Sequence, residues 1–254
     1  MNVKEPINAS TAEDLRLLHV DIDTMFVMSA SRRIERENDP DCSPGPQVFF
    51  VGCPFGNIAR VRYDVDDAIA VRILEVAAKE PPWSDPDAMP ACVGKIVELL
   101  SGPSAETVAS HLIYRLPNDV KYEHAAAIVH DDTAEGRQML ARLADRGMPD
   151  YMQTAGFKGV GDFWEPWCVA IERGEVASMA FAARLGEMGA EIGVYTFPTY
   201  RGRGLAAAVT ASWASMAPLN QRALFYSTSK TNRSSQRVAA RLGLRQIGAS
   251  FRIG

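Results

Sequence analysis

The sequence predicts an α/β protein, because short apolar runs typical of strands alternate with longer segments that have helical periodicity. The clearest case lies near the C-terminus. There the apolar run 192–197 precedes a glycine-containing turn at 201–204 and an alanine-rich, helix-favouring stretch at 206–217. With 254 residues, 47% hydrophobic and 23% charged, the chain can bury one sizeable core or two smaller ones.

Residues 1–110 are predicted to form a smaller N-terminal α/β domain that ends near the turn Ser101-Gly102-Pro103. Apolar runs separated by turn-rich pieces predict three strands, at 25–30, 48–52 and 58–63. Apolar residues at helical spacing predict two helices, at 64–79 and 89–100.

Residues 111–254 are predicted to form the second domain, which opens with a strand at about 108–115. The further strands are expected at 167–172, 176–183, 190–196 and 223–227. Helices are expected at 133–144, 205–216 and 234–242. Thr133 or the preceding Asp132 would cap the first of these helices, and Gly243 stands where a glycine commonly ends a helix.

The segment Arg201-Gly202-Arg203-Gly204-Leu205-Ala206 has the features of an anion-binding turn. Its glycines allow backbone conformations that a Cβ atom would forbid. The first amides of the helix that follows have no intrahelical partners and can donate to an anion. Two arginines add positive charge. The segment therefore predicts a site for a compound that carries a phosphate group.

Two common phosphate-binding motifs do not account for this turn. The pattern G-x-x-x-x-G-K-[ST] occurs nowhere in the sequence. The dinucleotide pattern G-x-G-x-x-G fits Gly202 and Gly204, but Ala207 occupies its third glycine position. The acidic residue that should follow is also missing, because residues 200–254 contain no Asp or Glu.

Charge is distributed unevenly along the chain. The net charge is −4, yet residues 200–254 carry nine basic and no acidic side chains, which leaves −13 on the first 199 residues. Such a basic segment suits a polyanionic cofactor. A solvated basic helix face is the alternative interpretation. A nucleic-acid surface is disfavoured, because the acidic remainder would repel a long polyphosphate.

Two motifs in this region resemble the GNAT superfamily of N-acetyltransferases. Arg201-x-x-Gly204-x-Ala206 matches the pyrophosphate loop [Q/R]-x-x-G-x-[G/A] of that family. About thirty residues on, the segment from Asn232 to Leu244 is similar to the family's N-x-x-[S/A]-x-x-L-Y-x-K-x-G-F stretch. The resemblance covers roughly residues 111–254. It implies a mixed, splayed β-sheet with helices on both sides.

The resemblance also implies that acetyl-CoA binds as co-substrate in a V between the strand before the loop and the next strand. Three residues of the first strand would pair their main chains with the pantetheine: Val194, Tyr195 and Thr196. Six residues of the turn would hold the pyrophosphate: Arg201, Gly202, Arg203, Gly204, Leu205 and Ala206. Asn232 and the weaker candidate Arg237 would contact the rest of the cofactor.

The candidate catalytic residues are Glu191 and Tyr226. Glu191, on the strand leading into the loop, is the expected general base for an amine, with Glu165 as the second candidate. Alternatively, Glu191 is a solvated strand-end residue that holds Arg184. The family's usual thiolate-protonating tyrosine is replaced by Ala239. Tyr226 or the adjacent Ser227 would then serve, unless the thiolate leaves unassisted or Tyr226 is a packing residue.

The expected function is transfer of an acetyl group from acetyl-CoA to an amine of a small molecule, by direct attack in a ternary complex. A peptide or protein N-acetyltransferase and a non-catalytic CoA-binding regulator stay open as alternatives. The N-terminal domain would wall the acceptor cleft, either as a degenerate copy of the same fold or as an unrelated accessory domain.

Partners and location follow from what the sequence lacks. The four cysteines form no C-x-x-C pair, and neither they nor the four histidines have metal-ligand spacing, so no metal is expected. No run of eighteen apolar residues and no apolar signal core occur, so we expect a cytoplasmic protein without a membrane partner. No nucleic acid is expected to bind, and a homodimer stays open.

Overall fold

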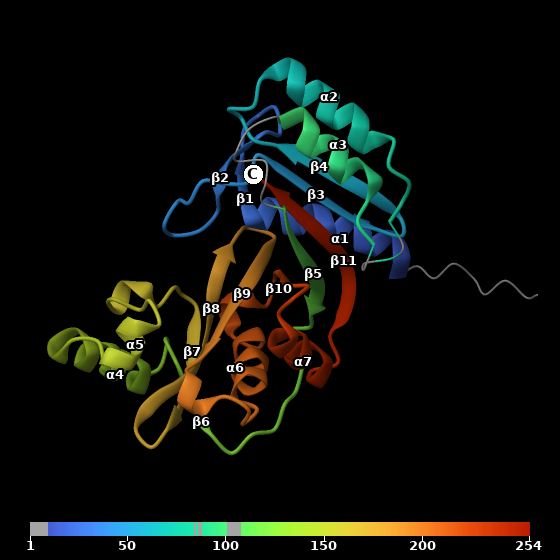
Figure 1. The fold of residues 1–254 in the computed structure, drawn as a ribbon. Coiled ribbons are helices and arrows are strands. Elements are labelled where there is room, and N and C mark those ends of the chain that lie inside the picture. The colour runs from blue at the N-terminus through green and yellow to red at the C-terminus, as the bar shows by residue number, and fades with distance from the viewer. Residues whose placement is uncertain (1–9, 84, 86–87, 101–107) are drawn as a thin grey trace, which may run out of the picture.

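The computed structural model describes residues 10–83, 85, 88–100 and 108–254 (Figure 1). The helices are α1 (Ser10–Met25), α2 (Asp67–Ala78), α3 (Ala91–Leu100), α4 (Ala134–Arg146), α5 (Asp150–Thr154), α6 (Leu205–Ala214) and α7 (Arg233–Arg241). The strands are β1 (Phe26–Met28), β2 (Ile34–Glu37), β3 (Val48–Cys53), β4 (Gly56–Val61), β5 (Val108–Leu116), β6 (Ala127–His130), β7 (Trp167–Glu172), β8 (Glu175–Leu185), β9 (Gly189–Thr196), β10 (Ala223–Ser229) and β11 (Arg245–Ile253).

Within these residues, β1 and β2 form a hairpin and the other strands form one nine-stranded sheet, in the order β4-β3-β11-β5-β10-β9-β8-β7-β6. The pairings in this sheet are antiparallel except that of β9 with β10, which is parallel. That pairing covers only Gly189–Glu191 against Ala223–Phe225, and the two strands then run on unpaired with each other. The predicted mixed, splayed sheet with flanking helices is confirmed.

Strands from the first and last parts of the chain lie side by side in this sheet. β5 lies between β10 and β11, and β3 pairs with β11 (Figure 1). The expected boundary between 1–110 and 111–254 therefore falls inside β5. The strands before and after this boundary belong to one sheet. The division into two domains therefore stays a prediction, and it concerns which part of the chain can fold alone.

Two elements at the chain ends have no counterpart in the expected set. The expected strand at 25–30 is instead the end of α1 followed by the short β1. Hydrophobic periodicity does not predict α1, because acidic residues interrupt its buried face, where Asp14 and Asp21 lie among apolar neighbours. β11 was not expected because Gly248, Ala249 and Ser250 weaken its alternation. The remaining expected strands and helices are found within a few residues.

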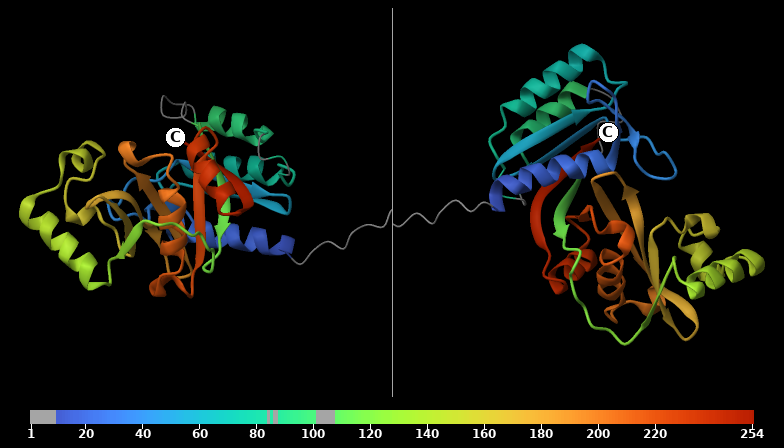
Figure 2. Two further views of the ribbon diagram at one scale, coloured as in Figure 1. Left: turned by 90° about the horizontal axis from the view of Figure 1, so that it is seen from below. Right: turned by 180° about the vertical axis from the view of Figure 1, so that it is seen from behind.

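The two faces of strand β3 bury side chains in two different layers. Val48 and Phe50 pack with α2 and α3, whereas Phe49 and Val51 pack with α1. This alternation is the period-2 pattern of a strand covered on both sides. Figures 1 and 2 show α1 on one side of β3 and β4, and α2 with α3 on the other. We call the side of the sheet that α1 covers the α1 face.

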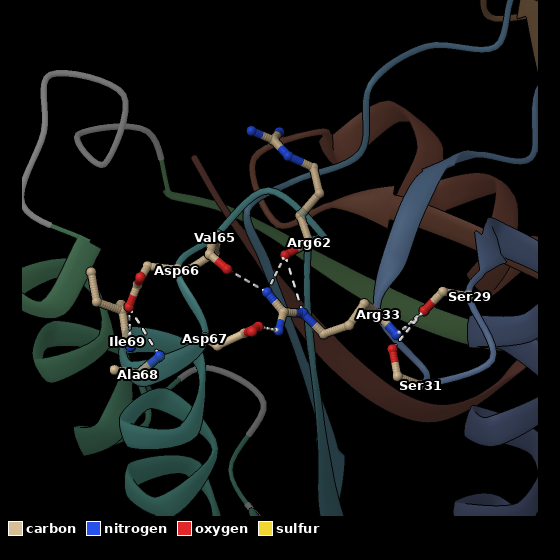
Figure 3. A network of polar contacts seen from close by, with 9 residues as sticks. All are labelled: Ser29, Ser31, Arg33, Arg62, Val65, Asp66, Asp67, Ala68 and Ile69. Carbon is tan, nitrogen blue, oxygen red and sulfur yellow. Dashed lines mark hydrogen bonds and ion pairs between the residues drawn. The ribbon is translucent and has the colours of Figure 1, made fainter.

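Arg33 joins the β1–β2 hairpin to the turn that leads into α2 (Figure 3). Its guanidinium donates to the carbonyl oxygens of Arg62 and Val65 at 2.8 and 2.5 Å, and to Asp67 at 3.0 Å. Asp66 caps α2 by accepting from the amides of Ala68 and Ile69. These contacts fix the hairpin against the rest of the N-terminal part.

α6 packs against β7, β8 and β9, where most of its side chains are buried. Its small residues permit close approach: the thiol of Cys168 on β7 lies 3.3 Å from the carbonyl oxygen of Val209. The tight packing fixes α6, and with it the turn at its N-terminus, against the strands that line the cavity described below.

Candidate active site

A cavity of about 1220 Å³ opens where β9 and β10 diverge. Its walls come from both faces of the sheet. α1 and the α1 face supply Asp21, His111 and Glu191, whereas the turn before α6 and the start of α7 supply Arg201 and Ser235. The cavity therefore passes through the sheet at the splay.

Glu191 lies at the apex of this splay, in the last pair that joins β9 to β10. Its side chain lines the cavity, and only 7% of the residue is exposed. Arg184 is its cross-strand neighbour, and the Ser227 hydroxyl lies near it. Glu191 is thus a buried cavity residue next to Arg184, and it is not a solvated strand-end residue.

Burial raises the pKa of the Glu191 carboxyl group above its ordinary value. Arg184, the Ser227 hydroxyl and Arg252 oppose this effect, because each stabilises the ionised form. A glutamate with a raised pKa is a better proton acceptor from an amine than an ordinary surface glutamate.

The glycine turn has the geometry that the sequence predicts. Gly202 and Gly204 have φ angles of +80° and +84°, and Gly204 is the N-cap of α6. Leu205 and Ala206 begin the helix, so their amides have no intrahelical acceptors. The turn residues that line the cavity are Arg201, Gly202, Gly204, Leu205 and Ala206.

Arg203 does not line the cavity. Its guanidinium forms an ion pair with Glu172 at 2.7 Å and lies over the ring of Tyr200. Its backbone carbonyl oxygen lies 2.8 Å from Nε2 of His124. The structure thus gives Arg203 a role in holding the turn, whereas the sequence pointed to it for the cofactor.

Val194, Tyr195 and Thr196 line the cavity. The amide of Phe197 donates to Ala177 on the β8 side. Because successive residues of a strand direct their main-chain groups to opposite sides, those of Val194 and Thr196 face the unpaired side towards β10. The Thr196 carbonyl oxygen already accepts from Nε of Arg201 at 3.1 Å, and the groups of this edge that lack a strand partner can hydrogen-bond an extended ligand.

Asn232 and Arg237 also line the cavity. The side-chain oxygen of Asn232 accepts from the amide of Ser235, which makes Asn232 the N-cap of α7. Its first role is therefore to fix the start of this helix. Arg237 and Arg241, on the same helix, add positive charge at the end of the cavity next to the glycine turn.

Tyr226 lies on β10 and lines the cavity beside α7. Its hydroxyl lies 2.7 Å from that of Ser235, and only 4% of the residue is exposed. Burial raises the pKa of the Tyr226 phenol, although the hydrogen bond with Ser235 opposes the rise. The group therefore stays protonated at neutral pH and can donate a proton.

Residues 158–249 match the family model of the GNAT acetyltransferases. This part of the chain is a GNAT acetyltransferase domain. The match includes the glycine turn, β9, β10 and α7, whereas α1 and β5, which supply Asp21 and His111 to the cavity, lie outside it. It supports acyl transfer as the general chemistry of the site.

Solved structures similar to this chain include proteins of the GNAT family. A GNAT-family protein from Novosphingobium aromaticivorans is 26% identical over 59% of this chain and 66% of its own, with a TM-score of 0.41. A GCN5-related N-acetyltransferase-like protein from Streptococcus suis is 14% identical over 96% and 100%, with a TM-score of 0.47. An acetyltransferase from Colwellia psychrerythraea is 13% identical over the full length of both, with a TM-score of 0.42. No curated protein matches the sequence.

Several cavity residues were not among the candidates from the sequence. They are Asp21 on α1, His111 on β5, Arg241 on α7, and Ser250 and Arg252 on β11. Arg241 alone had a signal, since it belongs to the second GNAT-like segment. The others come from α1, β5 and β11, and only the sheet order brings these elements to the splay.

Glu165, the second candidate base, does not line the cavity of the GNAT domain, and Ala239 is fully buried. Within the residues that the structure describes, no cluster of His, Cys, Asp and Glu could hold a metal ion. In the same residues no helix is long and apolar enough to cross a bilayer.

Proposed function

We propose that this protein transfers an acetyl group from acetyl-CoA to a primary amine of a small molecule. One observation supports this above all: a single continuous cavity is lined by the glycine turn at one end and by the buried Glu191 at the other. The GNAT family match supports acyl transfer in general. The amides of the glycine turn and the buried Glu191 further support the proposal, as a candidate anion site and a candidate proton acceptor.

The residues at the outer end of the cavity would hold the cofactor. Amides of the turn from Gly202 to Ala206, with the guanidinium of Arg201, would bind the pyrophosphate. Asn232, Arg237 and the free edge of Val194 and Thr196 would hold the remainder of the chain. When bound, acetyl-CoA supplies the activated thioester that is attacked.

The inner residues would perform the proton transfers. Glu191, directly or through one water, removes a proton from the attacking ammonium, which would otherwise stay protonated at neutral pH. The amine nitrogen then bonds to the carbonyl carbon while the carbon–sulfur bond breaks. A main-chain N–H of β9 would stabilise the negative charge on the carbonyl oxygen. The Tyr226 hydroxyl, hydrogen-bonded to Ser235, would protonate the departing sulfur.

We place the protein in the cytoplasm. Its four cysteines are free thiols, three of them buried, and this state is typical of a reducing compartment.

Calorimetry with acetyl-CoA, followed by a thiol-release assay over a panel of small amines, tests the proposed function. We expect heat of binding and release of one thiol for each amine acetylated. Binding without turnover on any amine would instead favour a CoA-binding regulator. Turnover on peptide amines alone would favour a peptide acetyltransferase. Absence of binding would contradict the cofactor site itself.

A further inference from the structure

The α1 face of the cavity holds polar groups that the proposed chemistry does not use. Asp21, on α1, is 1% exposed and lines the cavity, and its Oδ1 atom has no hydrogen-bond partner among the described residues. Nδ1 of His111, on β5, is likewise buried without a partner in the same cavity. A buried polar atom without a partner is rare in proteins. Two such atoms on different elements in one cavity indicate a ligand site.

Carboxyl groups outnumber guanidinium groups around Asp21. Three carboxyl groups, those of Asp21, Glu37 and Glu191, lie with the guanidinium groups of Arg184 and Arg252. Glu37 bonds to both arginines; its contact with Arg184 measures 3.0 Å. Asp21 and Glu191 have no such direct ion pair among the described residues.

A cation would balance the cluster when all three of its carboxyl groups are ionised. Burying an unpaired carboxylate costs several kcal/mol, and an ammonium group that hydrogen-bonds to it offsets that cost. An acceptor carboxylate would have to displace Glu37 from an arginine, because both guanidinium groups are already engaged. The site therefore favours an ammonium and disfavours a carboxylate beside it.

Apolar side chains complete this part of the wall. Met25, Phe49 and Ile113 line the cavity near Asp21, on the same α1 face. They can pack against the hydrocarbon part of an acceptor, whereas a polycation would lose hydration there without gaining partners.

We propose that Asp21, together with Glu191, binds the ammonium group of the acceptor. The acceptor is a primary amine on a compact apolar body, without a carboxylate next to the amine. This inference rests on the proposed acetyl transfer and adds its substrate class. It also makes α1, outside the matched GNAT segment, part of the acceptor site.

The test compares amines with the amino acids that differ from them only by a carboxylate. With saturating acetyl-CoA, kcat and KM are measured for tyramine and tyrosine, for phenethylamine and phenylalanine, and for spermidine. We expect kcat/KM for each aromatic amine to exceed that of its amino acid by at least about tenfold. A preference for tyrosine, phenylalanine or spermidine would overturn the proposal.

Asp21→Asn removes the charge and keeps the shape of the side chain. We expect the KM for tyramine to rise at least about tenfold, while the affinity for acetyl-CoA is unchanged. Asp14→Asn is the matched control, because Asp14 lies on the same helix but bonds to Arg245 outside the large cavity. An unchanged KM in Asp21→Asn, or an equal rise in both variants, would overturn the assignment. If Asp21→Asn does not fold, the KM for tyramine is measured on Asp21→Ser instead and compared with the same control.

Failure of the proposed function gives a different result. If acetyl-CoA binds but no amine is acetylated, calorimetry with tyramine on the wild type and on Asp21→Asn still decides the role of Asp21. Binding that weakens in the variant supports the ammonium site. Absence of tyramine binding to the wild type overturns it.

Discussion

At the scale of single residues, the site depends on where charge is buried. Glu191 is held at the apex of the splay, and its burial makes the ionised form costly, which raises its pKa. The same burial raises the pKa of Asp21, helped by the charge of Glu191. Both carboxyl groups are therefore more basic than surface carboxylates, and they stay protonated up to a higher pH.

Glu191→Gln is expected to lower kcat by about a hundredfold or more at neutral pH, because the acceptor then keeps its proton. The deficit should shrink as the pH approaches the pKa of the amine, about 10.4, where free amine needs no base. For the wild type, the rate should rise with pH as Glu191 loses its proton, at a pH above that of an ordinary glutamate. A pH–rate profile of both proteins measures this.

Glu165→Gln is the control for this prediction, because Glu165 does not line the cavity. Its profile should match the wild type. If Glu191→Gln also keeps wild-type rates across the whole pH range, Glu191 is not the base.

At the scale of elements, the segment that joins β5 to β6 packs against the turn before α6. A Cβ atom on Gly204 would lie 2.7 Å from the Tyr122 hydroxyl and 3.4 Å from Nη1 of Arg241. The Tyr122 ring stacks with that of His124, which in turn contacts the Arg203 carbonyl oxygen. The turn therefore has no room for a side chain at Gly204, although Gly202 has open space around it.

Gly204→Val is expected to weaken acetyl-CoA binding at least about tenfold, equivalent to about 1.4 kcal/mol, because a branched side chain displaces the turn. The left-handed φ by itself costs a non-glycine residue about 1–2 kcal/mol of folding stability. Calorimetry and thermal melting measure the two effects separately.

Gly147→Val separates strain from site damage. Gly147 has a φ of +82° and open space around it, at the end of α4 and outside the cavity. The Gly147→Val variant should be less stable than the wild type but keep its affinity for acetyl-CoA. Equal affinity in both variants would contradict the placement of the pyrophosphate at this turn.

At the scale of the whole molecule, the N-terminal strands and the GNAT domain form one sheet. β11, which ends the chain, pairs with β3 on one side and β5 on the other. Its Phe251 and Ile253 are buried against α2, α3 and Trp83. Removal of the N-terminal part would expose this apolar layer and one edge of β11.

Residues 111–254 expressed alone are therefore expected to aggregate or to lack a cooperative thermal transition, because an exposed apolar strand edge promotes association. Co-expression of 1–107 with 108–254 should restore a soluble complex. Circular dichroism and size-exclusion chromatography make the comparison. A soluble 111–254 fragment that melts cooperatively and binds acetyl-CoA would contradict this and support two separate domains.

The parts of the site that the sequence could predict are those encoded locally. Gly204 predicts a turn because glycine allows a positive φ, and the alanines of α6 predict a close-packed helix because they are small and favour helix. Asp21 and His111 could not be identified in this way. Their position depends on β5 entering between β10 and β11, and on α1 crossing one face. No local pattern encodes such long-range pairing. Arg203, which lies between the motif positions Arg201 and Gly204, pairs its guanidinium with Glu172 in this structure.

The insertion of β5 between two C-terminal strands has a consequence for biosynthesis. β3 and β5 cannot complete their pairing until β11 has left the ribosome, because β11 is synthesised long after both strands and is the partner of both. Until then the apolar layers of α2 and α3 have no complete cover. Folding of this sheet is therefore expected to wait for the synthesis of β11 and to leave apolar surface open to aggregation until then.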